Sequence, residues 1–152
     1  MIEKRIMEIT NNFLLTATEL AFIEEAENTR AFLADFYDLL KYVTGEELTV
    51  SLFVEIEIVK KYINVLKTRY NNRFSVNLKN EEDYKYIFIK RSSILDYFDQ
   101  KLSNIAEDLQ GIVTYFFEFE IDESCYLTLI QKIGEIPDIF KNVIEIIHKK
   151  SS

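Results

Sequence analysis

The chain has very little of the two residues that build disulfide frameworks and zinc sites. Its 152 residues include one cysteine, Cys125, and one histidine, His148. A single cysteine excludes an internal disulfide framework, and one cysteine with one histidine leaves too few good ligands for zinc. This usage suits a reducing compartment, so we expect a cytoplasmic protein in which Cys125 is an ordinary core or turn residue.

Positive charge and long apolar runs are also scarce. Eighteen Lys and Arg stand against 26 Asp and Glu, which gives a net charge of −8. Binding to nucleic acid or to an anionic membrane surface needs clustered basic residues, so we expect neither partner. No apolar run approaches the roughly 20 residues of a membrane-spanning helix, and the first residues lack the apolar stretch of a signal peptide.

Apolar residues are plentiful, at 48% of the chain, and twelve Phe and nine Tyr supply large side chains for a core. Their spacing by three or four predicts helices, and their alternation predicts strands. We expect helices over residues 2–23, 32–43, 52–70, 94–105 and 138–149, and strands over 74–78, 84–89, 112–121 and 126–131. Asn28 or Thr29, Ser51, and Ser92 or Ser93 are the predicted N-caps, and Gly45 is predicted to follow the end of the second helix.

This order predicts an α+β fold with two parts. Residues 1–46 form an antiparallel helical hairpin, and residues 47–152 form a layer of helices over one face of a mostly antiparallel sheet. A lone hairpin leaves its apolar stripe exposed. We therefore expect two copies to pair into a four-helix bundle, which makes a homodimer.

A short run near the start carries a family resemblance. The segment from Glu8 to Thr16 reads E-I-T-N-N-F-L-L-T. It resembles the phosphoacceptor motif of the LytS/YesM class of bacterial sensor histidine kinases, roughly Q-x-N-P-H-F-L-F-N, with Asn12 in place of the histidine. An imidazole can accept a phosphoryl group, whereas the nitrogen lone pair of a carboxamide is held in resonance and cannot.

The central part of the chain extends the resemblance. Residues 35–42 read D-F-Y-D-L-L-K-Y, and residues 50–74 read V-S-L-F-V-E-I-E-I-V-K-K-Y-I-N-V-L-K-T-R-Y-N-N-R-F. They look like the family patterns L-S-D-L-L-R-Y and V-T-L-x-E-E-L-E-Y-V-x-N-Y-L-x-I-Q-x-x-R-F-x-x-R. In the family these patterns join the dimerisation hairpin to the first helix of the GHKL-type ATPase domain.

The nucleotide-binding boxes of the family are matched poorly. Its N-box, P-L-V-E-N-A-x-K-H-G, aligns with residues 93–102, so that Asp96 replaces the glutamate and Tyr97 replaces the asparagine that binds magnesium. Its D-N-G-x-G box aligns with residues 132–136, so that Lys132 replaces the adenine-binding aspartate and only Gly134 remains of two glycines. The ATP lid is missing, and residues 141–143 look like the helix that follows it.

The resemblance therefore implies a kinase scaffold without kinase chemistry. Losing two charged hydrogen bonds or ligands costs roughly 3–6 kcal/mol, which is on the order of 10²–10⁴ in affinity, so no cofactor is expected. The surface of Glu8, Asn12, Phe13 and Thr16, which meets the response regulator in the family, is the predicted partner-binding site. We expect a protein that sequesters a response regulator or a sensor histidine kinase in two-component signalling.

Two other functions stay open. One is a phosphotransferase similar to the sporulation relay protein, although this role needs a histidine on the bundle and Asn12 stands there. The other is a structural scaffold.

Other candidate groups are expected to be structural. We expect Glu118, Glu120, Asp122 and Glu123 to form the solvated face and turn of a hairpin rather than a catalytic pair of carboxylates. The aromatic run of residues 115–119 is expected to be sheet core rather than a binding platform. His148 is expected near the C-terminal end of the last helix, where the helix dipole favours a cation.

Overall fold

The computed structural model describes residues 2–69, 74–106, 113–121, 125–133 and 136–149. Four helices, one 3₁₀ turn and seven strands lie in these ranges. In chain order they are α1 (Ile2–Ile23), α2 (Glu27–Val43), β1 (Thr49–Ser51), α3 (Leu52–Arg69), β2 (Phe74–Leu78), η1 (Glu82–Tyr86), β3 (Ile87–Lys90), α4 (Ser93–Ala106), β4 (Val113–Ile121), β5 (Cys125–Ile133), β6 (Ile136–Ile144) and β7 (Ile146–Lys149).

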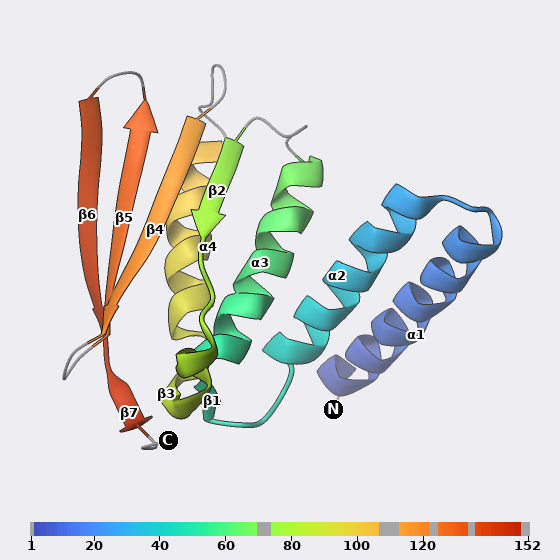
Figure 1. Cartoon of the computed structure of the whole chain (residues 1–152). Coiled ribbons are helices and arrows are strands. Elements are labelled where there is room, and N and C mark those ends of the chain that lie inside the picture. The colour runs from blue at the N-terminus through green and yellow to red at the C-terminus, as the bar shows by residue number, and fades with distance from the viewer. Residues whose placement is uncertain (1, 70–73, 107–112, 122–124, 134–135, 150–152) are drawn as a thin grey trace.

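The strands form two sheets, and most of their pairings are antiparallel. The larger sheet has the order β2-β4-β5-β6, in which only the pair β2–β4 is parallel. The smaller sheet has the order β1-β3-β7 and is antiparallel throughout. Helices α3 and α4 cover one face of the larger sheet, and the α1–α2 hairpin lies beyond α3 (Figure 1). The predicted α+β class, with a helical hairpin followed by a mixed region, is confirmed.

The core lies between helices α3 and α4 and the sheet. Phe98, Leu52, Ile56 and Ile94 are among its fully buried side chains. Strand β4 shows the alternation that the sequence predicts, because Phe119 and Ile121 pack against this core while Glu118 and Glu120 are exposed. Phe119 also meets the ring of Tyr84 edge-on, with the centroids 5.9 Å apart. The outer face of β4 is mixed, since Phe116 lies on the same side of the strand as Glu118 and Glu120.

The turn of the hairpin is tighter than the predicted caps imply. Glu25 adopts a left-handed conformation with φ 56°, and the amide of Ala26 donates to the carbonyl oxygen of Ala21 at 2.9 Å. Helix α2 therefore begins at Glu27 with Ala26 as its N-cap, so the prediction of Asn28 or Thr29 in this role was wrong. Glu27 in the first turn complements the helix dipole.

Two further predictions of helix ends, Gly45 and Ser51, are confirmed. Thr44 is the C-cap of α2, which places Gly45 directly after it as expected. The hydroxyl oxygen of Ser51 accepts a hydrogen bond from the amide of Val54 at 3.3 Å, so Ser51 caps α3 as predicted.

Polar pairs join α2 to α3 along their length. The amide nitrogen Nδ2 of Asn64 donates to Asp35 at 3.1 Å, and Lys61 forms an ion pair with Asp38. Asp35 and Asp38 lie three residues apart on α2, and their partners on α3 are also three residues apart but in reverse order, as in antiparallel helices. This spacing places each set on one helix face, so the hairpin is attached to the rest of the chain through α2.

The prediction of a last helix over residues 138–149 was wrong. Residues 136–144 form β6, which pairs antiparallel with β5, and residues 146–149 form β7. The segment contains Ile139, Phe140, Val143, Ile144 and Ile146, whose β-branched or aromatic side chains suit strands. Pairing with a neighbouring strand outweighs the helix-like spacing. Residues 141–143 are accordingly not a helix that follows a lid, and His148 belongs to a strand.

The predicted strand over residues 84–89 was half right. Residues 82–86 form the 3₁₀ turn η1, closed by a hydrogen bond from the amide of Tyr84 to the carbonyl oxygen of Glu81 at 3.0 Å. The strand begins only at Ile87. The turn buries the Tyr84 side chain in the core, a requirement that alternation along the sequence does not reveal.

Replacing Ser92 by glycine should raise the free energy of unfolding by about 0.5–1 kcal/mol, because Ser92 has φ 65° and only glycine adopts this conformation without strain. Urea denaturation measures the change. Ser93→Gly is the matched control, since Ser93 lies in α4 and its hydroxyl donates to the carbonyl oxygen of Lys90 at 2.6 Å. The control should be destabilised, and a loss of stability in Ser92→Gly would contradict the assigned strain.

Candidate functional site

Three of the four predicted partner-binding residues lie together on α1. Asn12, Phe13 and Thr16 line a shallow groove of about 450 Å³ whose other walls are apolar. Phe13 is 76% exposed. The hydroxyl of Thr16 donates to the carbonyl oxygen of Asn12 at 3.0 Å, so its proton is used within the helix. Glu8 is exposed on the same helix but does not line the groove.

This groove belongs to a larger exposed apolar face. Among the described side chains of α1, only Ala21 is buried. The large apolar side chains that remain exposed on α1 are Ile6, Ile9, Phe13, Leu15, Leu20, Phe22 and Ile23. Ile6, Ile9 and Phe13 fall with Leu20 on the side of the helix that holds the groove, whereas Leu15 and Phe22 fall on the opposite side. Soluble monomers seldom expose that many apolar side chains on one helix, so the side with the groove suits contact with another polypeptide.

The two predicted nucleotide positions on α4 point in different directions. Asp96 is exposed, whereas Tyr97 is only 8% exposed and belongs to the core. The ring of Tyr97 packs edge-on against Phe98 with the centroids 6.1 Å apart, and the ammonium of Lys101 lies 5.9 Å from its centre. The Tyr97 hydroxyl has no hydrogen-bond partner among the described residues, and burial raises the pKa of its phenol. This position supplies a phenol in the core where the resemblance expects an amide oxygen.

The start of α4 is held by a residue that the sequence reading did not single out. Glu55 of α3 is fully buried, and its carboxylate accepts hydrogen bonds from the amides of Ser92, Ile94 and Leu95 at 3.3, 3.2 and 3.1 Å. These are the unpaired donors at a helix N-terminus, where the helix dipole also favours negative charge. Glu55 therefore caps α4 from a neighbouring helix.

The same carboxylate reaches the hairpin. The hydroxyl of Tyr42, at the end of α2, donates to Glu55, and the guanidinium of Arg91 donates to the carbonyl oxygen of Tyr42. Arg91 also lies 4.4 Å from the centre of the Tyr42 ring and pairs with Glu47 at 3.1 Å. Burial raises the pKa of Glu55, and this effect exceeds the lowering by the three backbone hydrogen bonds. Helices α2, α3 and α4 thus meet at one carboxyl group.

A signal for Glu55 was present in the sequence. Glu55 falls three residues after Leu52 and one before Ile56, so it lies within the apolar face of α3. A carboxyl group at such a position needs partners in the folded protein. The partners are backbone amides of a segment that starts 37 residues later, which no sequence pattern names.

The remaining nucleotide positions are not brought together by the described structure. Lys132 lies in β5, opposite Pro137 of β6 in the register, and its side chain is outside the described set. Gly134 lies outside the described residues. The predicted places of both residues in a nucleotide site therefore stay predictions.

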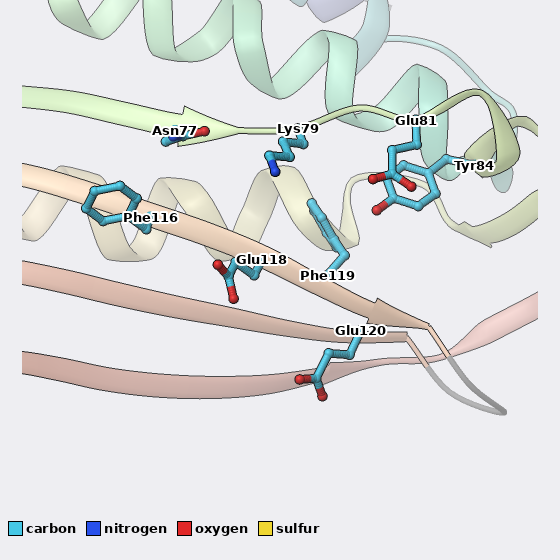
Figure 2. A pocket seen from close by; sticks show the side chains of 8 residues that line it. All are labelled: Asn77, Lys79, Glu81, Tyr84, Phe116, Glu118, Phe119 and Glu120. Carbon is cyan, nitrogen blue, oxygen red and sulfur yellow. The ribbon is translucent and has the colours of Figure 1, made fainter.

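The acidic residues of β4 line a second hollow, shown in Figure 2. Glu118 and Glu120 share it with Glu81 and Lys79, in a volume of about 300 Å³ with Tyr84 and Phe119 at one end. Glu118 and Glu120 are exposed, as a solvated strand face requires. In the described ranges no three His, Cys, Asp or Glu residues lie close enough to hold a metal ion. Asp122 and Glu123 lie outside those ranges.

Removing the Glu55 carboxylate should be costly. Glu55→Ala should lower the free energy of unfolding by about 2–4 kcal/mol, because it leaves buried amide donors without acceptors. In Glu55→Gln this loss should be smaller, and the dependence on pH should change. Since the pKa of Glu55 is raised from 4.5, the folded protein keeps a proton that the unfolded chain loses first. The free energy of unfolding of the wild type should therefore fall as pH rises from 4.5 through the raised value.

Urea denaturation is measured from well below pH 4.5 to above the raised pKa of Glu55, and subtracting the Glu55→Gln curve from the wild-type curve isolates this decline above pH 4.5. Glu57→Gln is the matched control on the same helix. The pKa of Glu57 is lowered, chiefly by a hydrogen bond from Asn80. Its carboxylate contributes stability above pH 4.5 that is lost as pH falls through the lowered value, so its difference curve should have the opposite sign. Curves of the same sign would contradict the described environments.

Comparison with known proteins adds one match. Residues 10–74 match the family model for histidine kinases. The match covers most of α1, all of α2 and α3 and the first residue of β2, so it includes Asn12 and Glu55 but neither Asp96 nor Tyr97. No curated protein matches the chain. No helix in the described part of the chain has the length and apolar character needed to span a membrane. The hairpin and α3 are therefore similar to histidine kinases, a similarity that indicates two-component signalling.

Proposed function

We propose that the chain is a catalytically inactive, histidine-kinase-like protein that acts by binding a protein of two-component signalling. The observation that carries the proposal is Asn12. It lies within the segment that matches histidine kinases and faces an exposed groove, yet its carboxamide has no nucleophilic nitrogen. The binding surface of the family would then remain while the phosphoryl acceptor is absent.

The start of α4 supports the proposal independently. A magnesium nucleotide needs oxygen ligands, and Tyr97 directs a phenol ring into the core instead. Asp96 supplies one exposed carboxylate. The described residues at this position therefore do not fit a magnesium nucleotide, and no phosphoryl transfer step is assigned to the chain.

The proposed form of the protein is a homodimer. In this proposal the hairpin, residues 1–46, supplies two helices to a four-helix bundle, and residues 47–152 are the inactive ATPase-like part. Leu20 and Ile23, exposed near the hairpin turn, support this pairing, because a two-fold axis would cover them in both copies at once and leave residues 8–16 accessible. The response regulator, or a kinase that exchanges into the bundle, would meet the Glu8–Thr16 part of the helix.

The dimer is tested near the turn of the hairpin. Leu20→Glu should weaken dimerisation by at least about a hundredfold, because each interface would lose two apolar anchors and bury two charges. Sedimentation equilibrium measures the association. Asn28→Glu adds the same charge at an exposed polar position of α2 and should leave the dimer intact. A monomeric wild type, or equal association of both variants, would reject the bundle.

Partner binding is tested with response regulators encoded beside the gene. Hydrogen exchange should show protection over residues 7–16 when a cognate regulator is added, and Phe13→Asp should abolish it. Glu19→Gln, also on α1 but outside the groove, is the control. Incubation with the phosphorylated regulator should leave no acid-labile label on this chain. Label on the chain would instead favour the phosphotransferase, and a lack of protection with every regulator would favour a scaffold.

A further inference from the structure

A third hollow lies between α2 and α4, away from the residues of the proposed partner-binding site on α1. We call it the α2–α4 groove. Its volume is about 240 Å³, and its lining includes Leu40 and Val43 of α2, Tyr62 of α3, and Leu95, Asp96 and Asp99 of α4. This volume is below the range of sites for whole cofactors, so it suits one or two large apolar side chains.

The inner part of the groove is apolar and fixed. Leu95 is buried in the core, and Leu39 beside it packs against that core. Val43 stands at the outer rim and is 51% exposed. Because α4 is capped by Glu55 and α2 is bonded to α3, both walls are held in place before any ligand arrives. A preformed apolar site loses little conformational freedom when it binds.

The rim on the α4 side is acidic. Asp96 and Asp99 are both exposed and lie three residues apart, so they share one face of the helix. The hydroxyl of Tyr62 donates to Asp99 at 2.6 Å, which holds that carboxylate beside the groove. The residues that line the groove include neither Lys nor Arg. Within the described part of the chain, Asp96 forms no ion pair.

We propose that the α2–α4 groove binds a basic amphipathic helix of a partner protein. One apolar side chain of that helix enters the groove, and a Lys or Arg one turn away pairs with Asp96 and Asp99. Helices recognised in grooves use anchors with this spacing. The acidic rim selects this occupant over a second copy, since the surface of a chain with a net charge of −8 is on average acidic too and offers the two aspartates fewer cations.

The probe is a synthetic alanine-based helical peptide with one Phe and, four residues later, one Lys. Matched peptides carry Gln or Glu in place of Lys. Titration followed by backbone amide NMR shifts of the full chain should map the Lys peptide to residues 39–43 and 95–99. The Gln peptide should bind about two- to five-fold more weakly, as expected for a partly exposed ion pair, and the Glu peptide more weakly still.

The variant Asp96→Asn with Asp99→Asn should remove the preference for the Lys peptide over the Gln peptide. The matched control, Glu118→Gln with Glu120→Gln, changes the net charge equally on the sheet face and should keep the preference. Equal binding of the Lys and Gln peptides to the wild type would overturn the proposal. Shifts that map outside the groove, or shifts of the same amides on dilution without peptide, would also overturn it, the latter by assigning the groove to a second copy.

Discussion

The carboxyl group of Glu55 is the point at which the helices of this protein are joined. It accepts hydrogen bonds from three backbone amides at the start of α4 and from the hydroxyl of Tyr42, and its side chain is fully buried. Burying an ionised carboxylate without partners costs several kcal/mol, and each of these donors offsets part of that cost. The raised pKa shows that desolvation remains the larger effect. The carboxyl group therefore has its hydrogen-bond partners, yet it ionises less readily in the folded protein than it would in water.

This junction also decides which residues of α4 face inward. The cap fixes the first turn of the helix, and successive residues then point about 100° apart, as the helical repeat requires. Asp96 consequently reaches the surface next to α2, and Tyr97 enters the core. These are the two positions that the family resemblance aligns with nucleotide binding. A tyrosine at the second position adds apolar surface to the core, and the cost is a hydroxyl without a described partner.

The sequence predicted the elements whose signals are local and long. Helix α1 and the strands β4 and β5 lie close to their expected ranges, because an apolar stripe over 22 residues or a strict alternation has few alternative interpretations. The last predicted helix failed because residues 136–149 are rich in β-branched side chains and form β6, which pairs with β5, and β7, which pairs with β3. These pairings are set by residues of other segments. For the candidate site, the sequence was enough to predict that Asn12, Phe13 and Thr16 lie on one helix face. The cap by Glu55 could not, since its donors are far along the chain.

The surface of α1 and the interior of α4 bear on the proposed function in different ways. A helix that exposes Phe13, Phe22 and Ile23 would be a liability in a monomer, because exposed apolar faces promote non-specific association. Such a face is consistent with a protein whose contacts are with other chains. Tyr97, in contrast, is packed within the core, so its side chain is engaged by neighbouring residues instead of facing a ligand. The start of α4, which the family resemblance aligns with nucleotide binding, therefore contributes a core side chain. Helix α1, which the resemblance aligns with partner recognition, exposes apolar surface. This distribution supports a binding role over a catalytic one, since binding needs only the outer surface of the hairpin.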